Sequence, residues 1–284
     1  MTEIVTHLNA GNLWSLPPWS AVPRAEGDVD YRQIKGAGFT GIQHHWYEAA
    51  YGEAGLDYSG MLKITSLAEA KAGFERLAPA APVHTTVHLG TGYESDAEAL
   101  ALIDGVTEVA GELGLAWSVE THRATLTQDP YRTLDLFERR PHLTFTADLS
   151  HWYTGGEMPY GDFSDKLERW APVLARTRYM HLRVGDSCTM QLPLSQAKHH
   201  PCWDHYTSMW QTCLAEASKD MDSTETLYIA PELLPAKVEF GGAAHHLNYA
   251  KVDNDGEETS DRWTDALELV EHVRNIAREA TRAS

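Results

Sequence analysis

The chain has 284 residues, of which 43% are hydrophobic, and it carries a formal net charge of −18 at pH 7. This length suits one large α/β barrel, which typically needs about 250 residues. A surface this acidic repels phosphate backbones and anionic lipids, so neither nucleic acid nor a membrane is expected as a partner.

The three cysteines, Cys188, Cys202 and Cys213, are odd in number and lack CxxC spacing. This pattern predicts free thiols in a reducing compartment. The N-terminal stretch MTEIVTHLNAG has neither the basic nor the apolar region of a secretory signal. No apolar run reaches the roughly 18 residues of a membrane span. We therefore expect a cytoplasmic protein.

Short apolar runs alternate with helical patterns along the chain, which is typical of βα units around a parallel sheet. A helix is expected at 31–37. Ser66 with Glu69, and Ser95 with Glu98, form the capping-box pattern that starts a helix. Strands of the first half are expected at residues 4–8, 39–44, 56–64 and 83–90.

The second half continues the alternation. Helices are expected from Asp129 to near Pro141, through Leu167 and Trp170, over 203–220 and over 263–277. Strands are expected at residues 115–122, 144–149, 178–185 and 226–234. Eight strands alternating with helices predict an α/β fold, a single (β/α)8 TIM barrel that occupies residues 1–284.

Two connections after predicted strands are long, at about 185–202 and 235–261. In a TIM barrel the strand-to-helix loops lie on the face that carries the active site, so both are candidate lids. The second contains the solvated run DNDGEE, and a surface excursion explains it equally well.

Four predicted strands end in a side chain that can bind a metal: Glu120, Asp148, His181 and Glu232. In a barrel these ends converge around the axis. Three carboxylates this close repel one another and raise one another's pKa, and a divalent cation removes the repulsion. Each residue alone also has an ordinary structural interpretation, but buried charges at four equivalent positions must be compensated. Three oxygens and one nitrogen suit Mn²⁺, Co²⁺, Mg²⁺ or Zn²⁺.

The segments VETHR, DLSHW, HLRVG and PELL, in this order, resemble the xylose isomerase-like TIM-barrel superfamily, in its sugar phosphate isomerase/epimerase branch. The resemblance is nearest to the ketose 3-epimerases and covers about residues 39–234. It implies that Glu120, Asp148, His181 and Glu232 bind the metal. It further implies that Glu120 and Glu232 move protons and that His151 contacts the substrate.

The chain departs from that pattern at two positions. The epimerases often carry a glutamate at the end of the second strand, where this chain has Gln43 followed by His44 and His45. They place a substrate-binding arginine several residues beyond the histidine of the seventh strand. Here the arginine is Arg183, two residues after His181, and β alternation puts both on one face.

Further candidates for substrate contact are His88, His122, His44 and Trp152, which follow or end predicted strands. A histidine at a barrel mouth is equally well explained as a structural side chain, and a tryptophan more often packs in the core. Of the pair His44 and His45, alternation predicts that one faces inward and the other outward.

These residues predict a metal-dependent isomerase or epimerase of carbohydrate metabolism. It would act on a ketose or keto-sugar through an enediolate, with Glu120 and Glu232 as the acid/base pair. One divalent metal ion, manganese among the candidates, and no nucleotide cofactor are expected. The expected substrate is a small sugar or keto-sugar. A homodimer is one possible oligomeric state.

Three alternatives stay open. The same site would support a metal-dependent lyase or hydratase acting on a 3-keto sugar or glycoside, because proton removal beside a ketone is the shared first step. A DNA-repair endonuclease of the same superfamily also carries such residues, but its D-x-H motif after the seventh strand is replaced here by GDSCTMQ. A non-catalytic barrel that binds a small molecule is the third, and the intact set of four ligands disfavours it.

Overall fold

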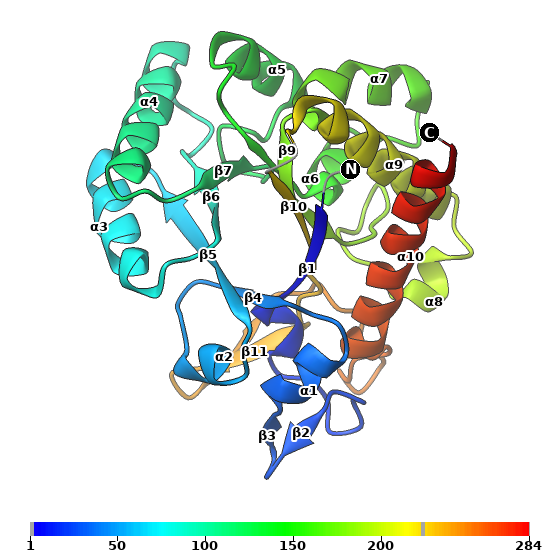
Figure 1. The fold of residues 1–284 in the computed structure, drawn as a ribbon. Coiled ribbons are helices and arrows are strands. Elements are labelled where there is room, and N and C mark those ends of the chain that lie inside the picture. Colours follow the sequence, from blue (N-terminus) through cyan, green and yellow to red (C-terminus); the bar gives the residue numbers. More distant parts are fainter. Residues whose placement is uncertain (1–2, 223–224, 284) are drawn as a thin grey trace.

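In the computed structural model, eight parallel strands close into a barrel that is surrounded by helices (Figure 1). The structure describes residues 3–222 and 225–283. Each strand pairs with the next in chain order, and the last one closes the barrel against the first. The predicted (β/α)8 TIM barrel is therefore confirmed. Its strands are β1 (Glu3–Asn9), β4 (Gly41–His44), β5 (Asp57–Ile64), β6 (His84–Leu89), β7 (Trp117–Glu120), β8 (Phe145–Ala147), β9 (Thr177–Leu182) and β10 (Thr226–Pro231).

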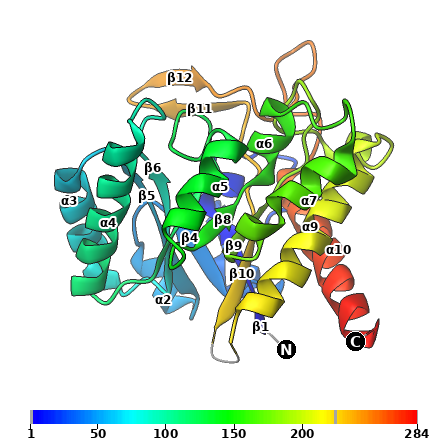
Figure 2. The ribbon, with the colours of Figure 1, turned by 90° about the horizontal axis from the view of Figure 1, so that it is seen from above.

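The helices between the strands cover the outside of the barrel (Figures 1 and 2). The longer helices turn rows of apolar side chains toward the strands, and α1 and α2 each bury one residue there, so the main core lies between the two layers. None of the helices within residues 3–222 and 225–283 is both long and apolar enough to cross a membrane. The covering helices are α1 (Tyr31–Gly36), α2 (Ala49–Glu53), α3 (Leu67–Leu77), α4 (Asp96–Glu112), α5 (Pro130–Arg139), α7 (Phe163–Leu174), α9 (Cys202–Asp220) and α10 (Arg262–Ala283).

Local signals start several of these helices. Ser95 and Glu98 form a complete capping box at α4. At α3 the Ser66 side chain accepts from the Glu69 N–H, but the Glu69 carboxylate bonds Thr65 instead of closing the box. Short-range hydrogen bonds of this kind depend on neighbouring residues alone, which is why the sequence predicts them.

The sixth strand is shorter than predicted, and a helix follows it that the sequence pattern did not indicate. The strand β8 ends at Ala147 and α6 (Leu149–Gly155) begins at once, with Asp148 as its N-cap. The prediction of a strand over 144–149 is wrong at its end because Leu149 stays buried in the helix, so the apolar run does not mark the boundary.

Both long connections contain structure. The first includes the helical turn α8 (Leu194–Ala197), and the second includes a hairpin of β11 (Lys237–Phe240) and β12 (Ala243–His246). Figure 2 shows this hairpin above the barrel, at the end opposite the N-terminus and therefore at the carboxyl ends of the strands. The remaining elements are the turns η1 (Ala10–Leu13) and η2 (Ala78–Ala80) and the small hairpin of β2 (Arg24–Ala25) and β3 (Asp28–Val29).

Candidate active site

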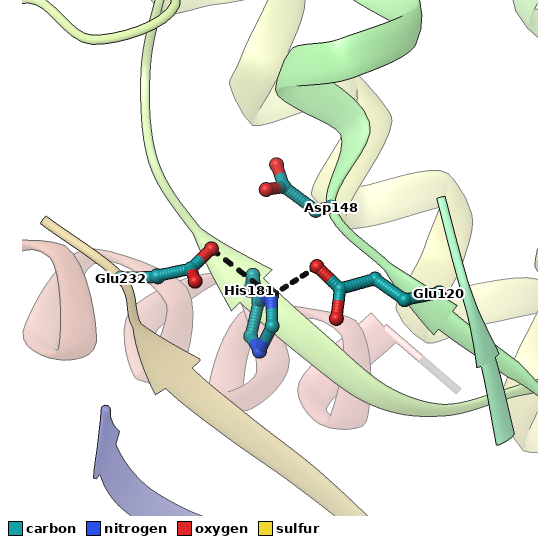
Figure 3. A group of neighbouring side chains, drawn as sticks. All are labelled: Glu120, Asp148, His181 and Glu232. Carbon is teal, nitrogen blue, oxygen red and sulfur yellow. Dashed lines mark ion pairs between the residues drawn. The ribbon is translucent and has the colours of Figure 1, made fainter. Parts of the chain in front are cut away.

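The four predicted strand-end residues meet at the carboxyl end of the barrel (Figure 3). Glu120 ends β7, His181 lies in β9, and Asp148 and Glu232 directly follow β8 and β10. One ligand atom from each lies within 4.8 Å of the others, and all four side chains are buried. Among the described residues this is the one group that could hold a metal ion. The three-metal cluster of the endonuclease alternative therefore finds no support.

His181 stands between two glutamates. Its Nδ1 lies 3.3 Å from Glu120 Oε1 and 3.3 Å from Glu232 Oε2, and His88 Nε2 approaches Glu120 Oε2 to 3.0 Å. Burial alone would lower the pKa of both histidines, but the effect of the facing carboxylates is larger. The pKa of His181 is therefore raised well above its ordinary value, and the pKa of His88 is also raised. Burial would raise the pKa of Glu120, yet His88 and His181 hold it well below its usual range.

Asp148 has two kinds of neighbour. One oxygen caps α6, accepting from the Ser150 N–H at 3.1 Å and from the Ser150 hydroxyl at 2.6 Å. The other pairs with the Arg183 guanidinium, which also lies 3.4 Å from Glu232 Oε2. Burial would raise the pKa of Asp148, but Arg183 and the nearby histidines lower it below its ordinary value. Asp148 is therefore an ionised side chain fixed in position.

The residues fit a divalent cation. Both carboxylate oxygens of Glu120, Nδ1 of His181 and Nε2 of His88 are buried and form no hydrogen bond with the described residues; they face one another only as ion pairs. Buried polar atoms are normally satisfied, and a hard or borderline cation is the partner that carboxylates and an imidazole suit. Glu120, Asp148, His181 and Glu232 would hold it.

A cavity of about 120 Å³ adjoins this group and contains several predicted substrate contacts. His44, His88, His122 and Arg183 line it together with Glu232. Burial lowers the pKa of His44 to about 4 and also lowers the pKa of His122, so both imidazoles stay neutral near pH 7. No lysine is among the described residues that line the cavity.

His151 lies beside the cavity. Its ring is tilted by 48° to that of His122, with 4.1 Å between ring centroids, and its Nε2 lies 3.4 Å from Asp148 Oδ2. The Arg123 N–H donates to its Nδ1 at 3.3 Å. Burial lowers its pKa well below the ordinary value. The residue is 6% exposed and is not among the described residues that line the cavity, so its contact with a substrate stays a prediction.

Trp152 does not reach the cavity, which corrects its prediction as a substrate contact. Its ring packs against Phe145 and Trp170, and its N–H donates to the Thr127 carbonyl at 2.8 Å. It sits in α6, whose helical turn carries it from the barrel mouth into the layer below the outer helices. We therefore drop it from the proposed substrate contacts.

The two histidines at the end of β4 also differ from the expectation. His44 and His45 both line the cavity. The strand ends at His44, so His45 lies beyond it and strand alternation no longer applies.

Tyr249 is a cavity residue that the sequence did not single out. It comes from the second long connection. The Arg183 guanidinium lies 5.1 Å from its ring centre, and Arg123 donates to its hydroxyl at 2.8 Å. In the sequence, only the length of this loop indicates that it could reach the site, and length does not identify a particular residue. The structure places this loop over the site.

No protein-family model matches the chain, and no curated protein matches it. Solved structures match nearly its whole length. A D-tagatose 3-epimerase-like protein is 9% identical with a TM-score of 0.59, over 99% of this chain and all (100%) of that one. A xylose isomerase-like TIM barrel protein from Mycobacterium smegmatis, in complex with magnesium, is 13% identical with a TM-score of 0.55, over 97% and 98% of the two chains.

The D-allulose 3-epimerase from Methylomonas sp. is 12% identical with a TM-score of 0.53, over 98% of each chain. At these identities the likeness shows the fold alone. It confirms the predicted resemblance to xylose isomerase-like TIM barrels at the level of fold. Several structural neighbours of this chain are thus named as sugar epimerases or as similar to them, and one was solved with a metal ion.

Proposed function

We propose that the protein is a metal-dependent isomerase or epimerase of an unphosphorylated ketose or keto-sugar, with Glu120 and Glu232 as its acid/base pair. The observation that carries this is the position of the two glutamates. They come from different strands, flank His181 and approach the same imidazole nitrogen at 3.3 Å (Figure 3). Two carboxylates in this arrangement can address two faces, or two neighbouring carbons, of one substrate.

A divalent cation bound by Glu120, Asp148, His181 and Glu232 would polarise a substrate carbonyl and acidify the adjacent C–H. One of Glu120 and Glu232 removes that proton, and the other returns a proton to the opposite face or to the next carbon. Both side chains are buried, so water does not compete for the proton while it is held.

The cavity lining supports a neutral polyol as the substrate. His44 and His122 present neutral imidazoles, which both donate and accept hydrogen bonds with hydroxyl groups. The one guanidinium that lines the cavity, Arg183, already pairs with Asp148 and lies near Glu232. Its Nη1 is buried without a hydrogen-bond partner among the described residues, so one donor remains for a substrate oxygen. A phosphate group would find no lysine in this lining.

The test is substitution of one acid/base residue. Glu232→Gln keeps the size of the side chain but cannot accept the proton, so we expect turnover to fall about 10²–10⁴-fold. Turnover is measured on a panel of ketoses and 3-keto sugars in D₂O, with metal content and circular dichroism recorded for the same preparations. A variant with full activity and full metal content would overturn the assignment.

The same incubation separates the lyase alternative. Both reactions exchange deuterium into the carbon beside the carbonyl. Only elimination releases water or an aglycone, so release of either would assign the protein to the lyases.

A further inference from the structure

Gln43 is one of the two positions at which this chain departs from the epimerase pattern, and the proposed reaction gives it no role. It is fully buried near the end of β4. Its Oε1 lies 2.8 Å from His181 Nε2, the ring nitrogen that faces away from the glutamates. The same oxygen accepts from Asn9 Nδ2 at 3.0 Å, and Gln43 Nε2 donates to Thr86 Oγ1 at 3.2 Å.

The orientation of these amides follows from a backbone group that can only donate. The Gly11 N–H donates to Asn9 Oδ1 at 2.8 Å, so the other end of the Asn9 amide, Nδ2, must face Gln43. An NH₂ group donates, so Gln43 must present its carbonyl oxygen there. That oxygen also faces His181 and can only accept. The Nε2 of His181 therefore carries a hydrogen.

From this chain of hydrogen bonds we infer that Asn9 and Gln43 are positioning residues that set the tautomer of His181, keeping hydrogen on Nε2 so that Nδ1 offers its lone pair to a divalent cation. The inference rests on the proposed metal site. It adds to that proposal the hydrogen bonds that fix the tautomer and orientation of the His181 ring. Partners of this kind fix ring orientation, and their loss typically lowers metal affinity about 10–100-fold.

An amide at position 43 also suits the charge of the site better than a carboxylate. Glu120, Asp148 and Glu232 carry three negative charges, and Arg183 together with a divalent cation carries three positive ones. A glutamate at position 43 would add a fourth buried carboxylate without a matching cation. Gln43 provides the acceptor and adds no charge. Asn9 Nδ2 lies 3.4 Å from Glu232 Oε1 as well, so the same pair contacts two of the metal-binding side chains.

The test compares Gln43→Met, which keeps the length of the side chain and removes the acceptor, with Gln43→Glu, which restores an acceptor. Zn²⁺ and Mn²⁺ affinities are measured by calorimetry on metal-stripped protein. Histidine ¹⁵N spectra of the Zn²⁺-loaded protein report which ring nitrogen carries hydrogen. We expect Gln43→Met to bind about 10–100-fold more weakly. The Nε2–H of His181 then has no acceptor to hold it, so it should exchange with solvent fast enough for its signal to disappear. Gln43→Glu should keep that signal and bind at least as tightly as the natural chain.

Ser118→Ala is the matched control. Ser118 belongs to the same buried network, through Thr146 and Thr86, but does not touch Gln43. It should leave the affinity and the His181 signal unchanged.

If the natural chain binds no divalent cation, the proposed function fails. If it binds and Gln43→Met binds equally with the Nε2–H signal intact, the positioning role is overturned and the proposed function stands. Should Gln43→Met not fold, loss of the signal in Gln43→Glu overturns the inference.

Discussion

At the scale of single residues, Asp148 joins a local role to a distant one. Through one oxygen it caps α6, which is a contact with a residue two positions away. Through the other it neutralises Arg183, which comes from the next strand along the barrel. Both neighbours are buried, so the two contacts hold the carboxylate in the position that a cation would need.

Asp148→Asn should separate these roles. Asparagine caps a helix as well as aspartate does, but the substitution removes the charge that faces Arg183. We expect the metal-free protein to lose about 3–5 kcal/mol of stability, because a buried guanidinium loses its nearest counter-charge. Urea unfolding in the presence of a chelator measures this.

Ser150→Ala serves as the control, because it keeps the N–H that Asp148 caps and removes only the hydroxyl, which donates to Asp148 and accepts from Arg183 Nε. Loss of these side-chain bonds should cost about 1–3 kcal/mol. Equal stability of Asp148→Asn and the natural chain would show that the ion pair contributes nothing.

At the scale of elements, the connection from β10 to α10 is tied down at its base and closes over the site. Arg262 is buried and donates to the backbone carbonyls of Gly11 and Leu233, and to Glu258 Oε2 at 2.7 Å. Glu258 in turn accepts from the Ala236 N–H at 3.1 Å. With its ends held, the loop brings Tyr249 over Arg183 and within hydrogen-bonding distance of Arg123.

Removing the Tyr249 ring should weaken substrate binding more than catalysis. Tyr249→Ala opens one wall of the cavity and uncovers Arg183, so we expect KM to rise about tenfold with a smaller change in kcat. Tyr249→Phe keeps the ring and loses the bond from Arg123, and its effect should be smaller.

Steady-state kinetics checks both variants, with the substrate that the D₂O incubations identify. Tyr93→Ala is the control, because Tyr93 is 93% exposed and lies away from the cavity lining. A Tyr249→Ala variant with an unchanged KM would show that the loop does not contribute to the binding site.

At the scale of the whole molecule, the barrel interior below the site is polar and holds two histidines. His84 Nε2 and the Ser118 hydroxyl are 2.6 Å apart, and His7 Nδ1 and the Ser59 hydroxyl are 2.8 Å apart. Burial, with a further contribution from neighbouring charge, lowers the pKa of each histidine from 6.5 to about 3. The folded protein therefore keeps both imidazoles neutral at pH values where the unfolded chain binds protons.

This difference predicts a loss of stability in acid. Above pH 6.5 neither state binds these protons, so the contribution is fully present. It is lost as the pH falls from 6.5 toward 3, by up to about 1.4 kcal/mol per pH unit for each histidine. His84→Gln should reduce that slope by one proton in urea unfolding between pH 7.5 and 5. Ser118→Ala breaks the same hydrogen bond without removing a titrating group, and it should leave the slope unchanged. The same slope in His84→Gln and the natural chain would contradict the prediction.

The residues that the sequence predicts well are those whose positions follow from local pattern. The period of apolar residues places the strands, and the ends of parallel strands meet at one end of a barrel. That is enough to bring Glu120, Asp148, His181 and Glu232 together before any contact is known. The capping box at Ser95 is equally local.

What the tertiary structure alone decides is which distant side chains touch. The pairing of Arg183 with Asp148, the place of Tyr249 over the cavity and the turn of Trp152 away from it depend on loop paths and on the early end of β8. The bond from His181 Nε2 to Gln43 Oε1 links strands on different sides of the barrel. Such contacts join residues far apart in the chain, and neither period nor spacing records them, because they arise only when the barrel closes.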